Sequence, residues 1–337
     1  MTPSERVLQF LRPLLGKRLM ERLRRNLPSR KPQLWEDAPR ALWRHAQLRW
    51  RTQFGRRAPV STILVRLPSA GAVMELSPKD RILDLAIFLY GVWEISSTRF
   101  VQQILKPGMT FIDVGANSGY YSLLAAGLVG PQGHVHAFEP VAGPFERLRR
   151  NLELNRLHNV TIARAAVASE PGDAIVYPSA VKNNDGLGSL EPGPEREVTG
   201  DLVPKVSIDH MFGALRMKRV DFIKVDVEGG ESQVFDGAHH VLGSPEAPAL
   251  LFESFDVRPM VESMAIFGYE VRHVHYSLDK GLEFPRVGEV FDNHSSGYDA
   301  PNYCAIKVPG RWGTFDEISR GSKYRLRTPL RILAALA

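Results

Sequence analysis

The first residues that could do chemistry form an acidic loop with two glycines. Asp113, Gly115 and Gly119 follow an apolar run at 110–114 in the pattern Asp-x-Gly-x-x-x-Gly. Glycines let a strand turn tightly into a helix and let a ligand approach the backbone, while the helix N-terminus offers free N–H groups. Asn117 stands where a dinucleotide fingerprint has its second glycine, and the carboxylate of Asp113 suits an ammonium better than two phosphates. The loop therefore favours a ligand with an amino-acid end over a nicotinamide dinucleotide.

A second acid follows the next apolar run. Glu139 comes after residues 135–138, twenty residues beyond Gly119, and Pro140 follows it. A carboxylate at this place can accept both hydroxyls of a ribose, so the ligand should contain a nucleoside. Ala166 and Val167 end a third apolar run and would supply an apolar surface for adenine. S-adenosylmethionine fits all these features, and the alternative is that the two acids only cap helices.

A third group of charges interrupts the apolar run at 221–227. Period two places Lys224, Asp226 and Glu228 on one side of an extended segment, and charges in a buried strand need partners or a function. Methyl transfer to a hydroxyl needs in-line approach and a base that removes the proton. Asp226 is the first candidate for this base or for a group that orients the substrate, and Glu228 is the second.

Two other interpretations of these charges stay open. Lys224 and Asp226 could form an internal ion pair, with Glu228 and Glu231 favouring the N-terminus of the next helix. Alternatively, Asp226, Glu228 and Glu253 could hold a divalent metal, although nothing in the sequence fixes such a geometry and we assign no metal site.

The elements that must position these residues alternate between strand and helix. Short apolar runs without alternation indicate buried parallel strands, and such strands alternating with helices predict an α/β fold with a doubly wound, mostly parallel sheet. The ligand then sits at the carboxyl ends of the strands. We expect strands at 110–114, 135–138, 160–167, 221–227 and 249–252, and helices at 82–90, 120–128, 145–155 and 232–242. A hairpin at 59–77 should precede them.

These segments together resemble a known family. The resemblance rests on FIDVGANSGYYSLLAA (111–126), HAFEP (136–140), LRRNLELN (148–155), Ala166-Val167, VSIDHM (206–211) and FIKVDVEGGESQVFDGA (222–238). They look like FkbM-type S-adenosylmethionine-dependent methyltransferases, over residues 90 to about 272, including Gly91 and Glu94. The resemblance implies a class I methyltransferase fold, Rossmann-like, and methyl transfer, typically to a hydroxyl oxygen of a sugar, polyketide or other small metabolite.

The charge distribution separates this region from the two ends of the chain. The 337 residues carry a formal charge of +6, but residues 1–60 hold 15 Lys and Arg against 4 Asp and Glu, a net charge of +11. Residues 311–337 have a net charge of +4, and the body between is acidic at −9. We expect a basic helical N-terminal extension at 1–58, a methyltransferase domain at 59–310 with its core at 105–272, and a basic C-terminal tail at 311–337.

The basic extension leaves partners open. It could dock on its own domain or a second copy, lie on an anionic membrane, or bind a polyanion such as RNA, although no nucleic-acid motif accompanies it. A non-catalytic cofactor-binding role is a further alternative. The single cysteine, Cys304, cannot close an intramolecular disulfide, and no signal peptide or membrane span is expected, so the sequence predicts a cytoplasmic location.

The remaining candidates carry weaker signals. His273 and His275 would share one face of a late strand, but no cysteine or carboxylate partner is spaced for a metal. The regions 178–204 and 276–301 are rich in polar and turn residues and should form surface loops or lids. The methyl acceptor cannot be read from the sequence.

Overall fold

The computed structural model describes residues 63–77, 83–178, 190, 199–227, 229–254, 256–277, 280–288 and 302–325. The described part of the chain divides into two units: residues 63–65 with 76–93, and residues 66–75 with 94–325. The extension predicted at 1–58 lies outside the described residues and stays a prediction. Every helix in the described part is too short or too polar to cross a bilayer.

The predicted hairpin is present. Strands β1 (Ile63–Leu67) and β2 (Ala72–Leu76) form a two-stranded sheet. Its turn is closed by the Gly71 N–H, which donates to the Leu67 carbonyl at 2.9 Å. In the first unit, helix α3 (Leu83–Tyr90) confirms the helical segment expected there, and its buried Asp84 accepts a hydrogen bond from the Ser77 N–H at 2.6 Å.

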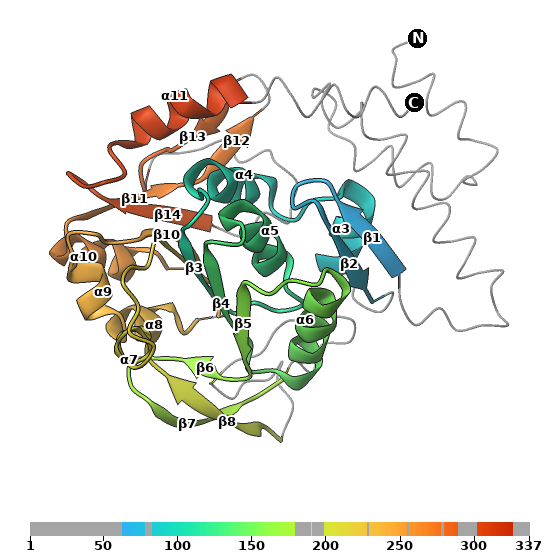
Figure 1. Cartoon of the computed structure of the whole chain (residues 1–337). Helices are drawn as coiled ribbons and strands as arrows, with labels where there is room; N and C mark the ends of the chain where they lie inside the picture. The colour runs from blue at the N-terminus through green and yellow to red at the C-terminus, as the bar shows by residue number, and fades with distance from the viewer. Residues whose placement is uncertain are drawn as a thin grey trace, which may run out of the picture. The chain divides into compact units, whose positions relative to one another are not determined.

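The second unit is built on a seven-stranded sheet (Figure 1). The spatial order is β11-β14-β10-β9-β3-β4-β5, and all neighbours are parallel except those of β14. The strands are β3 (Thr110–Val114), β4 (His134–Phe138), β5 (Val160–Ala163), β9 (Phe222–Val225), β10 (Ala249–Glu253), β11 (Tyr269–His273) and β14 (Asn302–Lys307). Cys304 is buried in β14, the closing strand that its apolar surroundings indicate.

Helices cover both faces of this sheet (Figure 1). On one side lie α4 (Ile95–Ile104), α5 (Tyr120–Val129) and α6 (Ala142–Leu154), and on the other lie α7 (Ile208–Ala214), α8 (Glu231–Asp236), α9 (His239–Gly243) and α10 (Arg258–Ile266). The second group packs its apolar residues on Ile112, Ile223 and Leu250 of the strands, all fully buried. On the opposite face Phe222 stacks with Phe111 and meets Phe100 of α4. The doubly wound, mostly parallel α/β fold is therefore confirmed.

The chain order along the sheet reverses between β3 and β9. From β3 the chain continues to β4 and β5 on one side, and it then returns to β9 and β10 on the other. Asp113 lies opposite Lys224, and Val114 lies opposite Val225. In open α/β sheets such a switch point, at the carboxyl ends of the strands, is where ligands bind. The three acidic segments singled out in the sequence all end at this edge.

The third predicted strand is wrong in one respect. Residues 160–167 do not form one strand, because β5 ends at Ala163 and Ala166–Val167 form β6 in a different sheet. That sheet has the order β6-β8-β7, with β7 (Gly172–Val176) and β8 (Asp201–Val206). The chain leaves the main sheet because Ala166 and Val167 pair with Lys205 and Val206 of β8. The loop predicted at 178–204 is accordingly also wrong at 201–204, and most of its remainder lies outside the described residues.

The helix predicted at 232–242 is two helices, α8 and α9. The second begins as a separate helix at His239, where the carboxylate of Asp209 accepts hydrogen bonds from the backbone N–H groups of His240 and Val241, at 2.8 and 3.0 Å. Such a carboxylate caps a helix N-terminus.

The late strand predicted to carry two histidines is also divided. His273 ends β11, whereas His275 begins β12 (His275–Ser277), which pairs with β13 (Gly281–Glu283) in a separate sheet. The two histidines therefore do not share a strand face. The second predicted loop, 276–301, is accordingly strand at 276–277 and 281–283, and residues 289–301 lie outside the described part.

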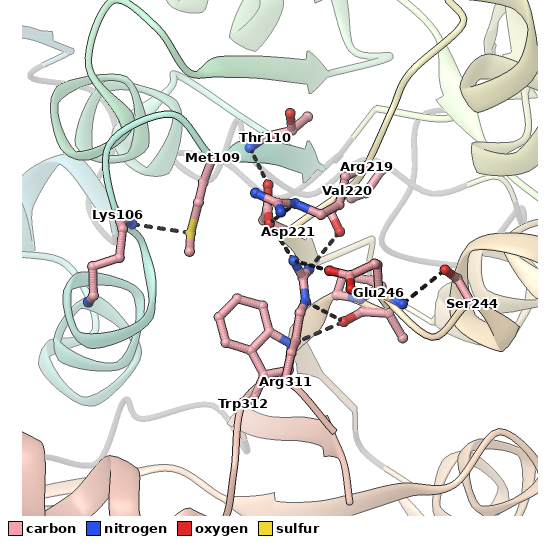
Figure 2. A network of polar contacts seen from close by, with 12 residues as sticks. Lys106, Met109, Thr110, Arg219, Val220, Asp221, Ser244, Glu246, Arg311 and Trp312 are labelled. Carbon is pink, nitrogen blue, oxygen red and sulfur yellow. Dashed lines mark hydrogen bonds and ion pairs between the residues drawn. The ribbon is translucent and has the colours of Figure 1, made fainter. Parts of the chain in front are cut away.

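Residues 311–325, assigned by sequence to the C-terminal tail, contact the domain. Arg311 Nη1 lies 2.6 Å from the buried carboxylate of Asp221, directly before β9, and its Nη2 donates to the Val220 carbonyl at 3.0 Å (Figure 2). The Trp312 ring N–H donates to the Ala247 carbonyl at 3.0 Å. Helix α11 (Phe315–Arg325) follows and packs on β13. The Arg311 and Trp312 contacts lie at the amino ends of β9 and β10, the edge opposite the switch point.

Candidate active site

The glycine loop connects β3 to α5 at the switch point. Gly115 and Gly119 have φ values of +74° and +95°, which side-chain-bearing residues rarely adopt. A Cβ on Gly115 would lie 1.8 Å from the carbonyl oxygen of Asp226, and one on Gly119 would lie 2.6 Å from Leu148 Cδ1. The glycines are thus needed by the chain's own packing, in addition to any ligand.

The backbone N–H groups of this loop are already used. Those of Gly115 and Ala116 donate to the Phe138 carbonyl at 3.0 and 2.9 Å, and that of Asn117 donates to Glu139 Oε2 at 2.8 Å. The Ser118 and Gly119 N–H groups donate to Asn117 Oδ1 and to the Ala116 carbonyl. The free N–H groups expected at the N-terminus of the following helix belong to the first turn of α5, which these five donors precede, and they stay a prediction. This arrangement is unsuited to a pyrophosphate, because a phosphate needs these donors.

The acid before the loop is buried and only partly satisfied. Asp113 is fully buried, and its Oδ2 accepts a hydrogen bond from Ser122 Oγ at 2.6 Å. Its Oδ1 has no hydrogen-bond donor among the described residues, and Lys224 Nζ lies 3.9 Å away. Burial raises the pKa of Asp113, against the opposing effects of Lys224 and Ser122. A ligand ammonium would supply the hydrogen bond that Asp113 Oδ1 lacks.

Glu139 follows β4 and accepts a hydrogen bond from the glycine loop. Its two carboxylate oxygens accept from the Asn117 and Val141 N–H groups, each at 2.8 Å. Each oxygen retains a lone pair, so the carboxylate can still accept hydroxyl groups. Burial raises the pKa of Glu139 to about 7, although these two hydrogen bonds lower it. Its affinity for a ribose should therefore depend on pH in the neutral range.

Lys224 and Asp226 form a pair at the carboxyl end of β9. Lys224 Nζ donates to Asp226 Oδ2 at 3.0 Å and to the Gly115 carbonyl at 3.4 Å. The lysine side chain is 5% exposed and the aspartate side chain 28% exposed, so the carboxylate reaches the surface of the site. Burial lowers the pKa of Lys224, but Asp226, Asp113 and Glu94 outweigh it and raise the pKa, which keeps the ammonium charged. The ion pair considered from the sequence is present, and its acid is open to a ligand.

Two further residues belong to this cluster. The Tyr121 hydroxyl on α5 donates to Glu94 Oε2 at 2.8 Å, and the Tyr121 ring centre lies 5.1 Å from Lys224 Nζ. Glu94 directly precedes α4 and is partly exposed. Sequence reasoning gave neither residue a role, because they are 105 and 132 positions from Asp226 in the chain. The signal available was that Gly91 and Glu94 belong to the family-like segment YGVWE.

For the other predicted site residues the structure gives a position in the fold or no description. Ala166 and Val167 are buried in β6, next to β5 in the chain, and Pro140 follows Glu139. The contacts of these three residues with a cofactor stay predictions. Glu228 lies outside the described residues, and within the described part no three His, Cys, Asp or Glu side chains are grouped closely enough to hold a metal ion.

The fold and this site define a Rossmann-like domain of the class I methyltransferase type. Residues 113–274 match the model of the methyltransferase FkbM domain. This segment is therefore an FkbM methyltransferase domain, as its motifs predict, and the cofactor of this domain is S-adenosyl-L-methionine.

Individual relatives match over limited segments. The chain is 28% identical to methyltransferase sdnD of Sordaria araneosa over 229 residues, covering 56% of this chain and 86% of that protein. It is 26% identical to the hexuronic acid methyltransferase AglP of Haloferax volcanii over 160 residues, covering 45% and 62%. The protein-L-isoaspartate O-methyltransferase of Methanothrix thermoacetophila is 43% identical over 58 residues, covering 17% and 28%.

The chain spans only 28%, 39% and 50% of the length of three isoaspartate methyltransferases that it matches. Among solved structures, a methyltransferase FkbM from Methylobacillus flagellatus aligns with a TM-score of 0.38 and 14% identity, covering 76% of this chain and 60% of that chain.

The residues present fit S-adenosylmethionine on two observations. The unsatisfied Asp113 Oδ1 and the internally bonded loop suit an ammonium group and not phosphates. Glu139 is buried at the end of the neighbouring strand, where it can accept ribose hydroxyls. When bound, this cofactor supplies an electrophilic methyl group on a sulfonium. Asp113 and Glu139 are the residues that would hold its two ends, and the Asp226 backbone lies directly against the Gly115 position of the loop.

Proposed function

We propose that this protein transfers the methyl group of S-adenosylmethionine to a hydroxyl oxygen of a small molecule, such as a sugar or polyketide. The observation that carries the proposal is the contact between the glycine loop and Asp226. The Asp226 N–H donates to the Val114 carbonyl at 3.1 Å, and its carbonyl oxygen occupies the space of the missing Gly115 side chain. A partly exposed carboxylate is thereby fixed beside the cofactor loop.

Charge favours a hydroxyl over a carboxylate as the acceptor. Asp113, Asp226 and Glu94 surround a single ammonium, Lys224. Such a cluster repels an anionic acceptor, whereas its carboxylates can accept hydrogen bonds from neutral hydroxyls. The protein-L-isoaspartate O-methyltransferases act on an isoaspartate residue, but this chain matches two of them over only 58 and 83 residues. Their acceptor is therefore not carried over to this protein. AglP is a hexuronic acid methyltransferase, which supports a sugar-derived acceptor. Because a hexuronic acid carries both hydroxyls and a carboxylate, this relative bears on the sugar and not on the choice between the two groups.

Asp226 takes the role of holding the acceptor hydroxyl or removing its proton. Lys224 fixes its Oδ2, so the carboxylate cannot rotate freely, and orientation of this kind lowers the entropic barrier to in-line attack. Glu228, two residues further on, keeps its proposed secondary role. A small-molecule acceptor also implies that the basic ends serve docking or self-association and do not bind substrate.

The first experiment identifies the cofactor. Calorimetry with S-adenosylmethionine, S-adenosylhomocysteine and NAD should give binding for the first two, and binding of NAD alone would overturn the proposal. Methyl-labelled cofactor is then incubated with a small-molecule cell extract. Label released as methanol by mild alkali indicates a carboxyl ester and contradicts the hydroxyl assignment. An alkali-stable labelled product is expected, and its structure by mass spectrometry and NMR must show a methyl ether; an N-methyl or C-methyl product contradicts the assignment.

Kinetics of two variants test the catalytic residues. Asp226→Asn and Glu228→Gln should lose turnover while keeping their fold and their affinity for S-adenosylhomocysteine. Wild-type turnover in both variants would sink the assignment. The same label experiment with an RNA fraction, and with a variant lacking residues 1–60, tests the alternative of a polyanionic substrate, which predicts binding that weakens strongly with salt.

A further inference from the structure

Glu94 is held in a conformation that its own helix does not require. Its φ value is +41°, in the left-handed region, and although it occupies the N-cap position of α4 its side chain makes no capping hydrogen bond. A left-handed conformation at a residue other than glycine costs on the order of 1 kcal/mol and is found at functional sites. The side chain instead meets the Tyr121 hydroxyl at 2.8 Å.

Tyr121 connects this acid to the pair at the end of β9. Its hydroxyl contacts Glu94, while its ring lies over Lys224 Nζ, which in turn bonds Asp226. Three segments far apart in the chain thus bring two partly exposed carboxylates to one lysine. Only one of those carboxylates, Asp226, hydrogen-bonds the ammonium directly among the described contacts.

The groups around Glu94 set its protonation. Burial and the charge of Asp226 raise its pKa to about 7, while Lys224 and hydrogen bonds from Tyr121 and from Asn302 of β14 act to lower the pKa. A general base works best when its pKa is close to the working pH, because it is then both ionised and able to hold a proton. Glu94 meets this condition near neutrality.

We propose that Glu94 is the catalytic base of the methyl transfer, and that Asp226, fixed by Lys224, orients the acceptor hydroxyl toward it. The proposal rests on the proposed function. As the acceptor oxygen bonds to the methyl carbon, its O–H bond breaks and the proton passes to the Glu94 carboxylate. The carbon–sulfur bond breaks with its electron pair remaining on sulfur. The products are a methyl ether and S-adenosylhomocysteine, and Glu94 then releases its proton to solvent.

The protonation of Glu94 is measured first, without any acceptor. Protein labelled with ¹³C at the glutamate side-chain carboxyl is titrated by NMR. Two resonances should titrate near pH 7, because burial also raises the pKa of Glu139 to about 7. One should be lost in Glu94→Gln and the other in Glu139→Gln, and both should be kept in Glu262→Gln, an exposed glutamate on α10. The midpoint of the Glu94 resonance should rise in Tyr121→Phe, which removes a hydrogen bond to the carboxylate, and fall in Asp226→Asn, which removes a negative charge.

The rate of transfer is measured next, using methyl-labelled cofactor at saturation and the extract fraction that carries the acceptor. Glu94→Gln should lower kcat by about 100-fold or more with S-adenosylhomocysteine affinity within twofold of the wild type. The wild-type kcat should rise with pH along a limb whose midpoint moves upward in Tyr121→Phe. A structural role for Glu94 would not move this limb. Glu262→Gln should match the wild type throughout.

The outcomes separate this proposal from the one on which it rests. If the wild type and Glu94→Gln transfer label at rates within threefold of each other, Glu94 is not the base, and the methyltransferase assignment stands. A Glu94 resonance that titrates below pH 5 also overturns the assignment of Glu94 alone. If the wild type transfers no label to any fraction, both proposals fail.

Discussion

The backbone carbonyl of Asp226 occupies the space that a side chain on Gly115 would need. A Cβ there would lie 1.8 Å from the Asp226 oxygen, so the loop after β3 and the end of β9 are in direct backbone contact. The cofactor loop and the proposed acceptor site are thereby one rigid structure. A substitution in either segment should alter the structure of the other, because displacing closely packed backbone atoms costs free energy.

Gly115→Ala should accordingly disrupt both halves of the site. The new methyl group overlaps the Asp226 carbonyl, and the φ value of +74° is itself unfavourable for alanine. We expect a loss of roughly 1–3 kcal/mol or more in the free energy of unfolding, together with loss of measurable S-adenosylhomocysteine binding. Urea unfolding and calorimetry measure the two effects.

Gly213→Ala is the matched control for this substitution. Gly213 is exposed on α7, its φ value is not positive, and a Cβ there meets nothing within 4 Å. Alanine at this helical position should leave stability unchanged or raise it by up to about 1 kcal/mol. If Gly115→Ala behaves like this control, the contact between the two segments has no energetic importance.

Glu139→Ala should weaken cofactor binding by about tenfold or more, since the ribose hydroxyls lose a charged acceptor. The wild-type affinity should also depend on pH, because the pKa of Glu139 is raised to about 7 by burial and the ionised form is the better acceptor. Between pH 8 and pH 6 the affinity for S-adenosylhomocysteine should fall by up to about tenfold.

Calorimetry at the two pH values checks this prediction, with the exposed Glu262→Ala as the control. The variant Glu139→Ala should lose most of the pH dependence together with the affinity. An affinity of Glu139→Ala equal to that of the wild type would count against placing the ribose at this carboxylate.

The same raised pKa predicts how the cofactor-free protein responds to pH. Folded Glu139 has a pKa of about 7 and the unfolded side chain about 4.5, so the folded state binds more protons between these values. Its contribution to stability is fully present below pH 4.5 and is lost as the pH rises through 7. The difference amounts to about 3 kcal/mol for this buried group.

Urea unfolding of the wild type and of Glu139→Gln at pH 5 and pH 8 isolates this contribution, because other groups titrate alike in both proteins. The wild type should lose about 3 kcal/mol more than the variant between the two pH values. Equal losses would show that Glu139 titrates normally in the folded state. Glu139→Gln keeps a neutral hydrogen-bonding side chain and so separates charge from packing.

The sequence predicted the parts of the site that lie close together in the chain. Asp113, Gly115 and Gly119 belong to one turn, and Glu139 follows the neighbouring strand, so local spacing was sufficient to place them. Period two placed Lys224 and Asp226 on one side of the strand, and the ion pair that the structure shows was one of the interpretations left open. The main sheet followed from short apolar runs, which indicate buried parallel strands wherever both faces are covered.

The sequence did not predict the contacts that depend on long-range packing. Glu94 reaches the site only because α4 and α5 pack beside each other, which no local pattern encodes. Ala166 and Val167 continue the apolar run of β5, yet pairing with β8 draws them into another sheet. The glycine-loop N–H groups donate to the Phe138 carbonyl and to Glu139 at the end of the next strand, so their acceptors cannot be identified from the loop's own sequence.

The far edge of the sheet offers a test in which two arginines share one acceptor. Arg311 Nη1 and Arg219 Nε each lie 2.6 Å from Asp221 Oδ1, whose carboxylate also accepts the Thr110 N–H through Oδ2 at 2.8 Å (Figure 2). The two arginines differ in exposure, since the side chain of Arg311 is 18% exposed and that of Arg219 is 44% exposed.

Arg311→Met should therefore destabilise the protein far more than Arg219→Met. Removing Arg311 leaves the buried carboxylate of Asp221 without its less exposed positive partner. It also removes the hydrogen bonds to the Val220 and Ala247 carbonyls, and we expect the free energy of unfolding to fall by about 3–5 kcal/mol. The more exposed Arg219 should contribute less than about 1 kcal/mol. Because this network lies at the amino ends of the strands, S-adenosylhomocysteine affinity of the folded variants should be unchanged. Equal destabilisation by the two substitutions in urea unfolding would show that exposure does not determine the strength of these contacts.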